Sequence, residues 1–137
     1  MNSGYQIEVY KDEDLREKIS KFILKNSWKG GYISGAIGSV KDVCFAVPAS
    51  NEYPPKIEFV SCPSAGELLS FSGEIIPAHL VPPPMKTIYP IDGDYFIHIH
   101  ASVAVAGSHI YGGGFLRGRA FRGVNIFIHP PLIAASI

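Results

Sequence analysis

The segment at residues 95–105 alternates between two kinds of side chain, and it constrains the fold more than any other part of the chain. Successive side chains of a β-strand point to opposite faces of a sheet, so the alternation divides the segment into two faces. One face is apolar and consists of Ile97, Ile99, Ala101, Val103 and Val105. The other is mixed and consists of Phe96, His98, His100 and Ser102. This is the longest strand-like run in the sequence, and it predicts a strand whose apolar face lies on a core.

The remaining patterns predict one helix among several short strands. Asp12 is a suitable N-cap, and Leu15, Ile19, Phe22 and Ile23 recur at helical spacing after it. Strand patterns cover residues 5–10, 31–39, 40–47, 56–60, 67–76, 115–120 and 124–128, with a glycine run at 112–114 that breaks the chain. They predict an α+β fold: an antiparallel or mixed β-sheet meander with one main α-helix and a short second helix or turn. The 137 residues fit a single domain, 1–137.

A proline-rich segment at about 77–90 interrupts the strand patterns. It contains the run Pro82, Pro83 and Pro84, and proline removes a hydrogen-bond donor from a sheet. The segment is therefore expected to be a loop or an extended arm. Met85 and Ile88 would pack either on the body of the same chain, as in a tethered surface loop, or on a neighbouring subunit.

Composition argues against long-range attraction to a polyanion. Twelve Lys and Arg balance twelve Asp and Glu, so the net charge is zero. Arg117, Arg119 and Arg122 gather near the end of the chain, where a charged strand edge is the favoured interpretation and a small basic face the alternative. Cys44 and Cys62 lack metal-type spacing and are expected to be thiols in a reducing compartment. With no basic leader before an apolar run and no membrane-length segment, we expect a cytoplasmic protein without membrane contact.

His98 and His100 are the best candidates for a functional locus. Two residues apart on one strand face, they lie about 6.5–7 Å from each other and could both reach one metal ion. A third ligand would complete an open catalytic geometry, but the spacing of His79, His109 and His129 singles none of them out. From the residues alone, hydrogen-bonded interior or interface histidines are the favoured alternative. No nucleotide-binding glycine motif and no nucleophile elbow accompanies the pair.

Four stretches, taken in order, resemble the PPC domain, the plant and prokaryote conserved domain, over nearly the whole chain. They are DEDLREKISKFILKN leading into GGYISGAIGSVKDV, then ELLSFSGEI, FIHIHASV and IYGGGFLRG. The resemblance implies an antiparallel-sheet fold, similar to that of the zinc enzyme acetolactate decarboxylase, and a homotrimer. In plants the domain accompanies AT-hooks in nuclear DNA-binding proteins, and stand-alone prokaryotic versions carry a DNA-binding label by that association. This chain has no AT-hook.

The resemblance also bears on the histidine pair. Prokaryotic members of the family commonly show a His-x-His pair followed by Gly-Gly-His, a trio that can hold a metal such as zinc. His98 and His100 match the pair, but Gly114 stands at the third position. His109 is the nearest substitute ligand along the sequence.

Two function classes follow from the sequence. The first is a trimeric PPC-domain protein that acts as a DNA-binding or regulatory module. A role without enzymatic activity is the favoured interpretation here. The second is a metal- or small-ligand-binding protein, with a metal-dependent enzyme as its extreme form, that uses the His98 and His100 face and a divalent metal such as zinc. A third interpretation is an ancestral metal site that has decayed or been repurposed for an organic ligand. The sequence identifies no catalytic residue and no organic cofactor site.

Overall fold

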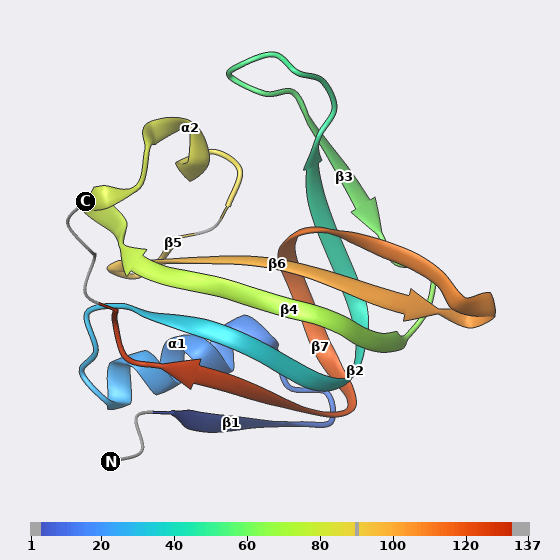
Figure 1. Ribbon diagram of the computed structural model, residues 1–137, viewed down its shortest axis with the longest axis horizontal. Helices are drawn as coiled ribbons and strands as arrows, with labels where there is room; N and C mark the ends of the chain where they lie inside the picture. Colours follow the sequence, from blue (N-terminus) through green and yellow to red (C-terminus); the bar gives the residue numbers. More distant parts are fainter. Residues whose placement is uncertain (1–3, 90, 133–137) are drawn as a thin grey trace.

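The computed structural model describes residues 4–89 and 91–132 and builds them around one antiparallel sheet (Figure 1). Its strands are β1 (Tyr5–Tyr10), β2 (Gly31–Pro48), β3 (Ile57–Ser61), β4 (Gly66–Pro77), β5 (Ile91–Asp92), β6 (Tyr95–Val105) and β7 (His109–His129). The helices are α1 (Leu15–Lys25) and the short α2 (Pro83–Lys86), with single 3-10 turns η1 (Ala78–Leu80) and η2 (Ala106–Ser108). The α+β class, with one main helix and a short second one, is therefore confirmed.

The strands close on themselves. Their order is β1-β7-β2-β4-β6-β5, β3 pairs with β2, and β7 pairs additionally with β6. The strands β2, β4, β6 and β7 thus form a ring in which each pairs with two others. Figure 1 shows how this is possible: β2 and β7 bend sharply, so each contributes to two differently oriented parts of the sheet. The ring encloses the core and directs the opposite faces of its strands outward.

Two breaks expected from the sequence are bends within continuous strands. Residues 31–39 and 40–47 belong to β2, which has 18 residues, and the glycine run 112–114 lies inside β7, which has 21. Both exceed the 11 residues of β6, so the expectation that 95–105 is the longest strand is wrong. The bends coincide with register shifts between β2 and β7, one of them beside Gly38 at φ +143°. A β-carbon there would overlap the Gly123 carbonyl, so glycine permits the close approach without ending the strand.

Helix α1 begins two residues later than the sequence suggests. Asp14, not Asp12, is the N-cap, and its Oδ1 accepts a hydrogen bond of 2.9 Å from the backbone N–H of Glu17. Asp12 instead occupies a left-handed turn at φ +70° and forms an ion pair with Lys41 of β2. The helix start is fixed by this turn, because the backbone N–H of Asp12 donates to the Ala120 carbonyl of β7 at 2.9 Å.

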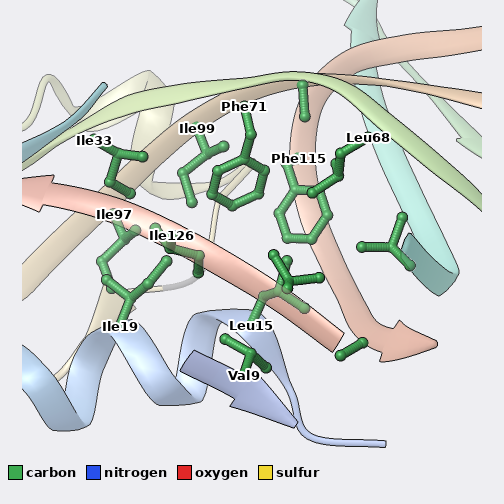
Figure 2. Packing of buried hydrophobic residues seen from close by; sticks show 14 of the residues in the cluster. Val9, Leu15, Ile19, Ile33, Leu68, Phe71, Ile97, Ile99, Phe115 and Ile126 are labelled. Atoms are coloured by element: carbon green, nitrogen blue, oxygen red, sulfur yellow. The ribbon is translucent and has the colours of Figure 1, made fainter. Parts of the chain in front are cut away.

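The apolar stripe of α1 packs on the inner face of the strands (Figure 2). Leu15, Ile19 and Ile23 have no exposed surface. Figure 2 shows Ile19 directed toward Ile97 of β6 and Ile126 of β7. The predicted apolar face of 95–105 is therefore a core face, as expected from its alternation. All five of its residues, Ile97, Ile99, Ala101, Val103 and Val105, belong to the main cluster.

The proline-rich segment packs on the outside of β6. Its residues Val81 and Tyr89 are buried against Phe96, which lies on the mixed face of that strand. Met85 and Ile88 are partly buried in the same small cluster, as the surface-loop interpretation expects. The short helix α2 lies within this segment (Figure 1). Pro90 lies outside the described residues.

Two further observations concern the setting of the chain. Cys44 is buried and Cys62 half-buried, and both are free thiols. Across residues 4–89 and 91–132, no helix is long and apolar enough to cross a membrane.

The packing of α1 generates a stability prediction. Replacing the fully buried Ile19 with Ala leaves a cavity against the sheet and should lower the free energy of unfolding by about 2–5 kcal/mol. The matched control is Leu24→Ala on the same helix, where the side chain is 65% exposed and the change should stay within about 0.5 kcal/mol. Urea denaturation followed by circular dichroism measures both. Equal losses in the two variants would contradict the assigned helix face.

Candidate functional site

The two histidines of β6 lie together on the outer face of the strand. His98 is largely buried, with 24% of its side chain exposed, and His100 is more open to solvent. Their ring centroids are 4.8 Å apart and the rings are nearly perpendicular. The sequence prediction that both imidazoles share one face is thus met by the structure.

Strand β4 supplies the polar neighbours of the pair. In the register of β4 and β6, Glu74 lies opposite His98 and Ser72 opposite His100. A carboxylate oxygen of Glu74 is 3.7 Å from Nδ1 of His98, an electrostatic contact slightly longer than a hydrogen bond. Beside them is an open cavity of about 420 Å³. Its lining consists of Tyr32, Ile33, Ser72, Gly73, Glu74, His98, His100 and Leu132.

The environment of His98 favours its neutral form. Burial lowers the pKa of His98, and the neighbouring His100 lowers it further, while Glu74 acts in the opposite direction. Because burial is the largest of these effects, the balance favours the neutral imidazole of His98. A neutral ring nitrogen can accept a hydrogen bond or bind a metal ion.

Gly114 faces the same site from β7. It pairs with His100 across the sheet, so a side chain at this position would project beside that histidine. The space is already taken: a β-carbon on residue 114 would overlap the Tyr89 hydroxyl and lie 2.9 Å from Tyr89 Cζ. Tyr89 comes from the proline-rich segment and rests edge-on against His98, with ring centroids 5.3 Å apart. The position of the family's third histidine is thus filled from elsewhere in the chain.

The remaining histidines do not join the pair. His109, the expected substitute ligand, lies opposite Val105, five residues beyond His100 on β6 and therefore about 16 Å away along the strand. His129 stacks on Tyr32 at 4.4 Å and forms a 2.8 Å hydrogen bond between its Nε2 and Ser34 Oγ. His79 is in η1 and lines a separate cavity. Within residues 4–89 and 91–132, no three His, Cys, Asp or Glu side chains are arranged to hold a metal.

Tyr89 and Glu74 are site residues that sequence reasoning missed. Glu74 could have been found, because it ends the polar alternation of β4 and only the register with β6 was lacking. Tyr89 gave no signal: it lies in a segment without periodicity, and only tertiary packing brings it to β6.

The arginines near the end of the chain are mostly neutralised by carboxylates. Arg119 donates from Nε to Asp42 at 3.1 Å, and Arg122 contacts Glu67 at 2.8 Å. The first pair links the neighbouring strands β7 and β2, and the second links β7 to β4, which lies on the other side of β2. Their positions fit a charged strand edge better than a basic groove.

Sequence comparison identifies the family of this chain. The model of the Plants and Prokaryotes Conserved (PCC) domain matches residues 2–130. The chain therefore belongs to this family, the one that the sequence motifs resemble. Comparison with curated proteins finds no match.

Solved structures of similar fold agree with this assignment. A plant- and prokaryote-conserved (PPC) protein of Pyrococcus horikoshii has a TM-score of 0.72 and 20% identity, covering 96% of this chain and 81% of its own. The "metal-containing protein AF0104" of Archaeoglobus fulgidus has a TM-score of 0.72 and 21% identity, covering 94% and 79%. A "putative dna binding protein" of Bacteroides thetaiotaomicron has a TM-score of 0.74 and 12% identity, covering 99% and 84%. At these identities the likeness establishes the fold.

The surroundings of His98 predict opposite pKa changes in two variants of the metal-free protein. The His98 ring should titrate below the ordinary value of 6.5. Glu74→Gln should lower the pKa further because it removes a favourable carboxylate, whereas His100→Ala should raise it because it removes a like charge. As pH falls through this range the unfolded chain takes up its proton first, so acidification should reduce the free energy of unfolding.

Imidazole proton shifts measured by NMR against pH report these midpoints. His109→Ala is the control and should leave the His98 midpoint unchanged, because His109 lies at the far end of the β6–β7 pairing. Movement of the Glu74 and His100 variants in the same direction would contradict the described arrangement.

Proposed function

We propose that this PPC-family protein binds a transition-metal ion through His98 and His100. One observation carries the proposal: two imidazoles with ring centroids 4.8 Å apart line one accessible cavity. The lowered pKa of His98 adds support, because a metal ion competes with protons for a ring nitrogen. The description of the Archaeoglobus fulgidus protein as metal-containing is consistent with this function.

Glu74 would act as the orienting partner of His98. Its carboxylate stands on the Nδ1 side of the ring, which leaves Nε2 as the nitrogen available to a metal. Metal-binding histidines commonly direct their other nitrogen to a carboxylate, which fixes the ring and increases its basicity. The outer-face residues of β4 and β6 thus fit a metal site with two imidazole ligands.

The nitrogen ligands alone would leave the site incomplete. Two histidines occupy two positions of a tetrahedral site, and the family's third histidine is replaced by Gly114. Remaining positions would be filled by water, by an organic ligand or by another group of the chain. A bound metal at such an open site lowers the pKa of water or polarises a carbonyl oxygen.

Metal content tests this proposal. Untagged protein should retain close to one transition-metal ion per chain after exchange into metal-free buffer, and His98→Ala and His100→Ala should each lose most of it. His109→Ala is the control variant and should retain the metal, because His109 lies opposite Val105, five residues from His100 along β6. Elemental analysis gives the stoichiometry. Less than about a tenth of an equivalent in the parent protein, or a content unchanged in His98→Ala, would refute the proposal.

A second candidate function is a homotrimeric module that binds DNA or regulates a partner. The family resemblance and the description of the Bacteroides thetaiotaomicron protein favour it. Apolar side chains exposed on the sheet supply surface that an assembly could cover. They are Ile37, Phe59, Leu69 and Ile110, each more than half exposed. The carboxylate pairing of Arg119 and Arg122 weakens the DNA version, because those cations already have partners.

Sedimentation velocity tests assembly and DNA binding in one experiment. The protein alone should sediment with the mass of three chains, and Ile37→Lys, Ile110→Lys or Phe59→Lys should dissociate the trimer wherever the changed side chain is covered by a subunit contact. DNA binding would appear as a duplex whose sedimentation increases at low salt and returns to normal at moderate salt. A monomeric species would refute the trimer, and an unchanged duplex at micromolar protein would exclude the DNA role.

A further inference from the structure

Tyr89 occupies a special place at the histidine site. Its hydroxyl fills the volume into which a side chain of Gly114 would project, directly beside the position paired with His100. Its ring lies edge-on to His98, with a centroid distance of 5.3 Å and an interplanar angle of 62°. The hydroxyl thus approaches the two histidines from the side of β7, opposite the side on which Glu74 lies.

No hydrogen bond is found for the Tyr89 hydroxyl within residues 4–89 and 91–132. The ring itself is well held, since Tyr89 is only 7% exposed and packs edge-on against Phe96 at 5.7 Å. A purely space-filling role would be served equally by phenylalanine, which avoids placing a polar oxygen in a largely buried position. The hydroxyl oxygen itself is not fully enclosed, so it is accessible to solvent and to a ligand.

The segment that carries Tyr89 is built to hold it in place. Pro82 precedes α2, and Pro83 and Pro84 form its first turn, which restricts the backbone before folding. The backbone N–H of Tyr89 then donates to the Met85 carbonyl at 3.1 Å. Val81 at the other end of the segment is buried in the same cluster. The phenol is accordingly presented from a fixed support, as a binding group requires.

We propose that Tyr89 Oη is the third protein ligand of the metal site formed by His98 and His100, and that the site takes ferric iron in preference to zinc. This inference rests on the proposed function. It replaces the missing third histidine by an oxygen from a different part of the chain. Glu74 remains the orienting carboxylate behind His98.

The chemistry of the donor set supports this selectivity. On binding, the phenol gives up its proton to solvent and the resulting phenolate oxygen forms the bond to the metal, with no change of oxidation state. Phenolate is a hard anionic donor, and tyrosinate is an established ligand of ferric iron in proteins. Imidazole also suits iron, whereas structural zinc sites are built from cysteine and histidine. Two imidazoles and one phenolate would leave further coordination positions open.

Visible absorption provides the test, because a phenolate bound to ferric iron gives a charge-transfer band that neither imidazole nor unbound tyrosine gives. Metal-free protein would be titrated with ferric iron supplied as its nitrilotriacetate chelate. The band should develop to one iron per chain. It should be absent in Tyr89→Phe, with iron affinity weakened at least about tenfold. Tyr32→Phe is the matched control, since Tyr32 lines the cavity beside His98 and His100, and it should keep the band.

A second variant separates loss of the tyrosine ligand from loss of the fold. Gly114→Ala keeps all three proposed ligands, but its β-carbon displaces the Tyr89 hydroxyl, so the band should be lost or strongly reduced. Circular dichroism confirms that each variant is folded. Iron that binds through His98 and His100 with a band unaffected by Tyr89→Phe would overturn the role of Tyr89 while leaving the proposed metal site intact. Absence of any His98-dependent metal uptake would overturn both.

Discussion

The pairing of β7 with both β2 and β6 is the interaction on which the rest of the structure depends. Gly114 of β7 lies opposite His100 of β6 and opposite Ala46 of β2, so one residue belongs to two ladders. This double pairing closes the ring of β2, β4, β6 and β7 around the apolar side chains. With the interior filled by residues such as Ile97 and Phe115, the alternate side chains of β6 have only the outer face available. The histidine site is thus a direct product of strand closure.

The sequence predicted the parts of this arrangement that depend on local periodicity. The alternation in 95–105 was sufficient to separate core from site on β6, and the spacing of Leu15, Ile19 and Ile23 was sufficient to locate α1. Bends were missed because a glycine such as Gly38 can either end a strand or let it bend, and only the neighbouring backbone decides which. Asp12 was predicted as the N-cap in place of Asp14 for the same reason, since a tertiary hydrogen bond from Asp12 to Ala120 sets the helix start.

Only half of the candidate site could be predicted from the sequence. His98 and His100 could be found because they are adjacent on one face of one strand. Glu74 and Tyr89 come from β4 and from the proline-rich segment, and their meeting depends on strand register and on the path of an irregular segment. His109 is near His100 in the sequence but not in the structure. Antiparallel pairing of β6 and β7 places it opposite Val105, at the end of the hairpin next to η2.

The fit between Gly114 and Tyr89 makes the two positions a single evolutionary unit. A histidine at 114 and a tyrosine at 89 compete for one volume, so neither can be gained without loss of the other. Relatives of this chain should therefore divide into two groups, one with a side chain from β7 at this point and one with a ring supplied by the proline-rich segment. The energies of changes at the two positions would not add, because the cost of each depends on which residue occupies the other. The proline-rich segment is in this sense an exchangeable part of the site.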